Sequence, residues 1–79
     1  MPTRELTYGE KAVGLTFNPS GDKKVNEVKT LYAKIIDICA ELRLRTEAGQ
    51  GEKGRLLSVA ITEAQTAQMW AVKGITFQE

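Results

Sequence analysis

The residues best suited to binding chemistry lie in the segment GLTFNPSGDKKV, which covers residues 14–25. It combines an aromatic ring at Phe17, an amide at Asn18, a rigid Pro19 and a lysine at Lys24, close to the start of a helical pattern. An aromatic ring can stack on a base, free N–H groups at a helix start accept an anion, and lysine supplies charge to a phosphate. The segment is therefore suited to a ligand with a base and a phosphate. The alternative is that this loop closes over the rest of the chain, with Phe17 as its plug.

Lys29, Arg55 and Thr62 are further candidates for ligand contacts. Lys29 lies one helical turn after Val25, at the edge of an apolar face. Arg55 begins the second long helical pattern, and we expect it to be unpaired. Thr62 follows Arg55 by seven residues, or two helical turns, so both side chains could line one face. Taken alone, each of these residue types is more often an ordinary surface residue.

The sequence lacks the residues of common catalytic and metal sites. It has no histidine, no serine nucleophile with a nearby base and no glycine-rich phosphate loop. Asp37 and Glu41 are four residues apart on a helical pattern, and we interpret them as a solvated face. The single Cys39 permits neither an intrachain disulfide nor a zinc site, and we interpret it as a small buried hydrophobe. We therefore expect no enzymatic activity, no metal and no cofactor.

Charge and hydropathy narrow the class of partner. A formal net charge of +1 argues against a DNA or RNA backbone as the main partner, because such binding needs a strong basic excess. The sequence has no signal peptide, no apolar run of membrane-spanning length and no lipidation motif. A lone free thiol fits a reducing cytosol. We expect a cytoplasmic protein without nucleic-acid or membrane partners.

Two long helical patterns position these residues within a single domain of 79 residues. A short helix over residues 7–13 has Thr7 as its expected N-cap and Glu10 as the capping-box partner. Ser20 is the expected N-cap of the first long helix, and Gly74 the expected C-cap of the second. The expected segments are an N-terminal segment (1–20), a helix (21–45), a glycine-rich turn (46–54), a helix (55–73) and a tail (74–79).

These elements predict an all-α fold, an antiparallel helical hairpin preceded by a short helix or loop. On the second helix, we expect Trp70 and Met69 in a core or an interface and the polar Gln68 on the outer side. In a single hairpin each long helix has only the other helix to cover its apolar surface, and part of that surface stays exposed. We therefore expect hairpins to associate into a compact homo-oligomer. On the first helix, the expected heptad seam consists of Val25, Val28, Tyr32, Ile35, Cys39 and Leu42.

Two stretches carry a resemblance to a known family. These are GEKAVGLTFNPSGDKKV (residues 9–25) and RLLSVAITEAQTAQMWAVKGIT (residues 55–76). The second contains an arginine, then a T-x-x-Q pattern, then a methionine followed by an apolar residue. Together they resemble the phage helical-hairpin proteins that counter bacterial cyclic-nucleotide immunity, the anti-CBASS and anti-Thoeris sponges. The resemblance covers roughly residues 8–77.

The resemblance implies a phage immune-evasion protein that acts in the host cytoplasm. Members of this family are non-enzymatic and form homo-oligomers of helical hairpins, commonly hexamers. They sequester cyclic dinucleotides such as cyclic GMP-AMP and cyclic trinucleotides, and some members sequester a cyclic ADP-ribose derivative. The defence effector that these messengers activate is then never switched on.

The resemblance also implies site residues. In the family, an aromatic from the N-terminal segment stacks on a base, which matches Phe17, with Tyr8 as the runner-up. A lysine in an apolar-Lys pair on the first helix contacts the ligand, which matches Lys29 after Val28. For cyclic dinucleotides the candidate set is Phe17, Asn18, Pro19, Lys24, Lys29 and Tyr8. For cyclic trinucleotides, a second kind of pocket implies the set Arg55, Thr62 and Thr30.

Two other functions stay open at this point. A small helical oligomeric adaptor would bind a host or phage protein through the second helix, which is rich in Gln and Ala. Such an adaptor has no need for Phe17, Lys24 and Lys29 together. A minor nucleic-acid binder is opposed by the near-neutral charge, and a flat salt dependence of binding would dismiss it.

Overall fold

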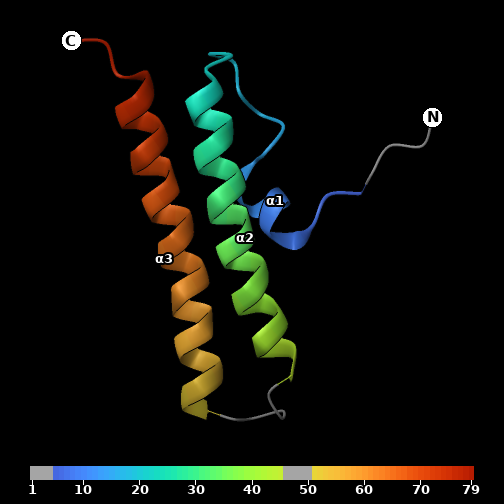
Figure 1. Cartoon of the computed structure of the whole chain (residues 1–79). Coiled ribbons are helices and arrows are strands. Elements are labelled where there is room, and N and C mark those ends of the chain that lie inside the picture. Colours follow the sequence, from blue (N-terminus) through green and yellow to red (C-terminus); the bar gives the residue numbers. More distant parts are fainter. Residues whose placement is uncertain (1–4, 46–50) are drawn as a thin grey trace.

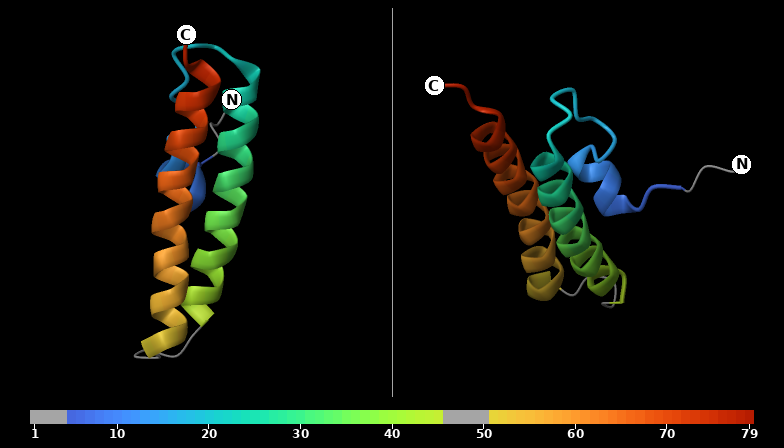
Figure 2. Two further views of the ribbon diagram at one scale, coloured as in Figure 1. Left: turned by 90° about the vertical axis from the view of Figure 1, so that its left-hand side faces the viewer. Right: turned by 45° about the horizontal axis from the view of Figure 1, so that its top comes forward.

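The computed structural model describes residues 5–45 and 51–79, which form three helices and contain no strand (Figure 1). These are α1 (Tyr8–Val13), α2 (Lys23–Arg45) and α3 (Gly51–Thr76). Helices α2 and α3 lie side by side and antiparallel, and α1 packs on α2 on the side away from most of α3 (Figure 2). The expected all-α hairpin with a short N-terminal helix is confirmed.

Helix α1 begins and ends as its sequence predicts. The Thr7 hydroxyl accepts a hydrogen bond from the Glu10 backbone N–H at 3.1 Å, and the Glu10 carboxylate accepts one from the Thr7 N–H at 2.8 Å. This reciprocal pair is the expected capping box, and it satisfies two backbone donors that a helix start leaves open. Gly14 ends the helix in a left-handed conformation and turns the chain toward the segment that carries Phe17.

Helix α2 starts later than the expected residue 21, and Ser20 is not its N-cap. Gly21 has a φ of 70°, a left-handed conformation that cannot belong to a right-handed helix. The Asp22 carboxylate instead accepts a hydrogen bond from the Lys24 N–H at 2.8 Å, so Asp22 caps the helix. Ser20 supports this cap, since its hydroxyl accepts a hydrogen bond from the Asp22 N–H at 3.1 Å.

Helix α3 is longer than expected at both ends. It begins at Gly51 rather than Arg55, so residues 51–54 of the expected turn are helical, and residues 46–50 lie outside the described residues. Glycine disfavours a helix by about 1 kcal/mol but does not forbid it, and an ion pair three residues apart, Glu52–Arg55, supports this first turn. Gly74 is not the C-cap, because the helix continues through it to Thr76.

The buried face of α2 differs from the expected heptad seam. Its buried residues are Val25, Lys29, Ala33 and Ile36, whereas Ile35 and Leu42 of the seam are exposed. Helix α2 is apolar over more than half of its circumference, and the packing of α1 and α3 decides which part is covered. The core is therefore small, and its buried cluster consists of Val13, Ala33, Ile36, Ile61 and Ala64.

Close backbone contact joins α1 to α2. The Gly9 N–H donates a hydrogen bond of 2.6 Å to the Asp37 carboxylate, and a Cβ atom at Gly9 would lie only 2.1 Å from the Ala33 carbonyl oxygen. Only glycine fits at this distance. Asp37 is therefore not part of a solvated face, as the sequence suggested, but anchors the start of α1.

Large apolar side chains remain exposed on both long helices. Leu31, Ile35, Ile38 and Leu42 form one stripe along α2, at the spacing of a helical face. On α3 the exposed residues include Leu56, Val59, Met69 and Trp70, and Trp70 is 66% exposed. Trp70 and Met69 are thus not in the core of the chain, and an interface role stays a prediction.

Cys39 is half-buried at the edge of the core. In the described part of the chain, no helix has the length and hydropathy needed to cross a bilayer.

Candidate functional site

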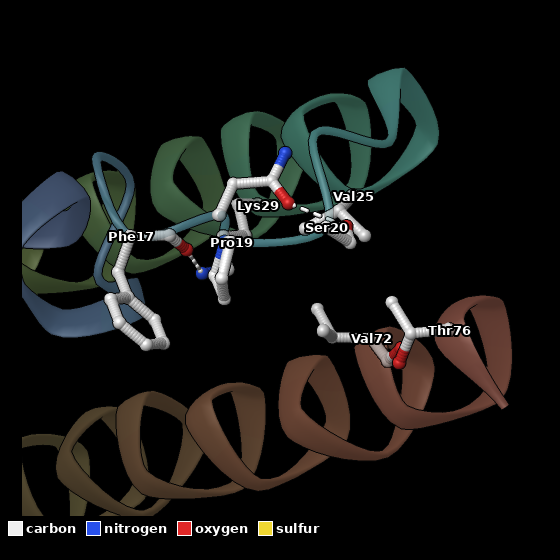
Figure 3. Close-up of a pocket in the computed structure, with 8 residues that line it drawn as sticks. Phe17, Pro19, Ser20, Val25, Lys29, Val72 and Thr76 are labelled. Carbon is white, nitrogen blue, oxygen red and sulfur yellow. Dashed lines mark hydrogen bonds between the residues drawn. The ribbon is translucent and has the colours of Figure 1, made fainter.

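Two adjacent pockets lie between the segment after α1 and the C-terminal half of α3. The first, which we call the loop pocket, has a volume of about 210 Å³. Figure 3 shows Val72 and Thr76 pointing from α3 toward the loop that carries Phe17 and Pro19. The extension of α3 beyond Gly74 therefore supplies part of this wall. The lining residues are Phe17, Asn18, Pro19, Ser20, Val25, Lys29, Val72 and Thr76.

The second pocket, which we call the Gln68 pocket, has a volume of about 330 Å³ and shares one wall with the first. Phe17, Lys29 and Val72 line both pockets. Its remaining lining residues come from the end of α1 and from α3, namely Val13, Gly14, Gln68 and Met69. Both pockets are mostly apolar, with few polar groups, which is the usual character of a small-molecule site.

Lys29 is buried, with only 5% of its surface exposed. Its ammonium group donates hydrogen bonds to the backbone carbonyl oxygens of Gly14, at 3.0 Å, and of Phe17 (Figure 3). A buried charge requires such partners, because leaving water without them is strongly unfavourable. Lys29 thus holds the loop against α2, and this role has no signal in the sequence because the acceptors are backbone atoms.

Phe17 is 70% exposed, so it does not plug the hairpin. Its backbone is fixed at both polar groups, since the N–H donates to the Gly14 carbonyl at 2.9 Å and the carbonyl accepts from Lys29. The Lys29 nitrogen lies 5.6 Å from the ring centroid, within the range of a cation–π contact. The result is an exposed aromatic face on an ordered loop, with a positive charge beneath it.

Asn18 fastens the loop to the start of α2. Its side-chain amide donates to the Asp22 carbonyl at 3.0 Å and to the Asn26 side chain at 3.3 Å. Its side-chain oxygen accepts a hydrogen bond from the Ser20 hydroxyl at 2.8 Å. Asn18 and Pro19 both line the loop pocket, but the polar atoms of Asn18 are engaged in holding the loop.

Lys24 and Tyr8 lie outside both pockets. Lys24 is exposed and forms a 3.0 Å ion pair with Glu27 one turn further along α2. Tyr8 is the first residue of α1 and is exposed. Of the residues suggested for a cyclic dinucleotide, the structure therefore brings together Phe17, Asn18, Pro19 and Lys29, and it places the other two elsewhere.

The residues suggested for a cyclic trinucleotide do not line these pockets. Arg55 is not unpaired, because its guanidinium donates to the Glu52 carboxylate at 3.1 and 2.7 Å, which lowers the pKa of Glu52. Arg55 and Val72 are separated by about 25 Å along α3, at 1.5 Å per residue. Thr62 is exposed two turns after Arg55, and the Thr30 hydroxyl donates to the Asn26 carbonyl of its own helix at 2.7 Å.

Gln68 is a site residue that the sequence did not reveal. We expected it on the outer side of the second helix, but it is buried and lines the Gln68 pocket. Its spacing from Ile61 and Ala64, seven and four residues earlier, places it on their buried face. That periodicity was the available signal, and the polar residue type concealed it. Within residues 5–45 and 51–79, no group of three His, Cys, Asp or Glu side chains could hold a metal ion.

Comparison with known proteins identifies the family. The family model described as Acb2/Tad1, hairpin domain, matches residues 10–76, which is most of the chain. No curated protein and no solved structure matched in the corresponding comparisons. The match begins within α1, covers α2 and α3 completely, and includes every lining residue of the two pockets. The chain therefore belongs to the Acb2/Tad1 hairpin-domain family, the family of anti-CBASS and anti-Thoeris sponges.

Proposed function

We propose that this protein binds and sequesters host cyclic oligonucleotide messengers without cleaving them, and so blocks CBASS-type anti-phage defence in the host cytoplasm. The observation that carries the proposal is the exposed Phe17 ring, fixed by Lys29 at the rim of two apolar pockets. The ring offers a stacking face for a base. The family membership supports a sponge rather than a receptor or an enzyme.

We propose a homo-oligomer because of the exposed apolar surface, and a hexamer because of the family resemblance alone. The stripe of Leu31, Ile35, Ile38 and Leu42 on α2 and the residues around Trp70 on α3 are exposed in the isolated chain. Contiguous apolar patches of this kind mark protein–protein contacts. Assembly would bury them and would place pockets of neighbouring chains close together. Sedimentation or mass photometry measures the number of subunits.

The decisive experiment is isothermal titration of the protein with 3′,3′-cyclic GMP-AMP, followed by chromatography of the recovered ligand. A sponge binds the ligand tightly and returns it intact. Degraded ligand would show catalysis. Absence of heat with a panel of cyclic dinucleotides, cyclic trinucleotides and cyclic ADP-ribose compounds would reject the proposal and favour an adaptor that uses the exposed surface around Trp70.

Phe17→Ala is expected to weaken cyclic dinucleotide binding at least tenfold without changing the oligomer mass. Stacking on an aromatic ring contributes roughly 1–3 kcal/mol per base, and a tenfold change in affinity corresponds to about 1.4 kcal/mol. Tyr8→Ala is the matched control, because Tyr8 is an exposed aromatic outside both pockets. Loss of binding in Tyr8→Ala but not in Phe17→Ala would assign the stacking role to Tyr8 instead.

We also propose a second, separate site for cyclic trinucleotides around Arg55 and Thr62. Arg55→Ala is expected to weaken trinucleotide binding and to spare dinucleotides, because Arg55 lies far along α3 from the two pockets. Lys53→Ala removes a neighbouring exposed charge and serves as the control. Titrations of both variants with both ligand classes test this. Equal loss of the two ligands in Arg55→Ala would mean one shared site.

A further inference from the structure

Gln68 has an unexplained polar atom inside the protein. The residue is only 6% exposed, and its side-chain carbonyl oxygen has no hydrogen-bond partner among the described residues. A buried acceptor without a donor is unfavourable, because it has given up its bonds to water, and native structures keep few of them. An apolar residue would fill this position on α3 at lower free energy. The amide therefore indicates a partner that arrives from outside the chain.

The surroundings of Gln68 restrict what that partner is. Among the side chains that line the Gln68 pocket, only Lys29 and Gln68 are polar. The Lys29 ammonium is engaged by the carbonyls of Gly14 and Phe17, whereas the Gln68 oxygen is a buried acceptor without a donor. The other walls are apolar, and the exposed Phe17 ring stands at the rim. A volume of about 330 Å³ is at the lower end for ligand pockets and suits one base rather than a whole dinucleotide.

We propose that Gln68 recognises the edge of an adenine base that stacks on Phe17. Once the buried amide turns toward the pocket, the exocyclic amine of adenine donates a hydrogen bond to the Gln68 carbonyl oxygen, and the amide nitrogen of the same side chain donates to N7 of the base. A carboxamide offers an acceptor and a donor side by side, which matches this edge of adenine and is a common pairing of glutamine with adenine. The assignment rests on the proposed function and adds a base preference to it.

The test compares cyclic di-AMP with cyclic di-IMP, in which a carbonyl oxygen replaces the exocyclic amine. Wild-type protein is expected to bind cyclic di-AMP at least tenfold more tightly, because the N7 edge of hypoxanthine carries two acceptors, its carbonyl oxygen and N7, and has no donor for the Gln68 oxygen. Gln68→Met keeps the length of the side chain and removes both polar atoms. This variant is expected to lose the preference: its affinity for cyclic di-AMP falls about tenfold, while its affinity for cyclic di-IMP stays within about twofold of wild type. Gln65→Met makes the same change outside both pockets and is expected to behave as wild type.

The stability of the variant separates recognition from packing. Gln68→Met is expected to melt at the same or a higher temperature than wild type, because it removes an unsatisfied buried amide. A lower melting temperature with equal loss of both ligands would instead assign Gln68 to packing and overturn the inference. A wild type without adenine preference, or a Gln68→Met variant that retains it, would also overturn the inference and leave the sponge function intact. If wild type binds no cyclic nucleotide at all, the proposed function fails as well.

Discussion

Gly9→Ala is expected to detach α1 from α2 and to lower the free energy of unfolding by about 3 kcal/mol, at the upper end for overpacking. The new Cβ would lie 2.1 Å from the Ala33 carbonyl oxygen and 2.8 Å from the Asp37 carboxylate. The carbonyl belongs to the backbone of α2 and cannot move aside, so α1 must shift and lose its hydrogen bond to Asp37. Thermal and urea unfolding followed by circular dichroism measure the loss.

Gly54→Ala is the matched control for this prediction. Gly54 is inside α3, and a Cβ atom there would meet nothing within 4 Å. The substitution is expected to stabilise the protein by about 0.5–1 kcal/mol, because alanine loses less backbone freedom on folding. If Gly9→Ala proved as harmless as Gly54→Ala, the close packing of α1 on α2 would be wrong. The segment after α1 carries Phe17, so Gly9→Ala should also weaken ligand binding.

Lys29→Met is expected to lower the free energy of unfolding by about 2 kcal/mol and to weaken cyclic dinucleotide binding at least tenfold. A hydrogen bond to a charged group contributes about 1.5–3 kcal/mol, and Lys29 donates to two backbone carbonyls. Removing a buried charge offsets part of this loss, since its desolvation was unfavourable. Without the ammonium group, the loop keeps only its Asn18 contacts to the start of α2, and the Phe17 backbone carbonyl loses its donor.

The control for Lys29→Met is Lys24→Met, on the same helix. Lys24 is exposed and pairs only with Glu27, an interaction that contributes little to stability. Lys24→Met is therefore expected to change neither stability nor dinucleotide binding appreciably. A Lys29→Met protein that melts as wild type yet fails to bind would show that the ammonium contacts the ligand directly. A variant that melts and binds as wild type would contradict both roles of Lys29.

Local sequence signals predicted the features that depend on near neighbours. Thr7 and Glu10 form the capping box within one turn of each other, and this pair located α1. Such signals do not predict which side of α2 faces its neighbours, because apolar residues cover more than half of the circumference of the helix. The heptad seam therefore fits the sequence as well as the stripe through Ala33 that is buried in the structure. The glycines near residue 51 suggested a turn where a local ion pair supports a helix.

In the candidate site as well, the features that depend on near neighbours were predictable from the sequence, and those that depend on long-range packing were not. Phe17 drew attention to this loop because it is an aromatic residue in a segment with no periodic apolar face to join, and the structure places Phe17, Asn18 and Pro19 together at the loop pocket. The acceptors of Lys29 are main-chain atoms 12 and 15 residues earlier, which no residue type reveals. Gln68 was missed because its polarity suggested solvent, whereas its position follows the buried face of α3. The positions of Lys29 and Gln68 both depend on long-range packing, which a single sequence does not display.

The anchoring of the Phe17 loop bears on how quickly the protein could capture its ligand. A sponge competes with the receptor of a messenger, so the speed of capture matters as much as the affinity. A loop already tied to α2 through Lys29 and Asn18 needs no folding step when the ligand arrives. Association is then limited by diffusion and orientation rather than by a slow rearrangement. Under the proposed function, the buried Lys29 would therefore raise the association rate of the messenger as well as hold the loop in place.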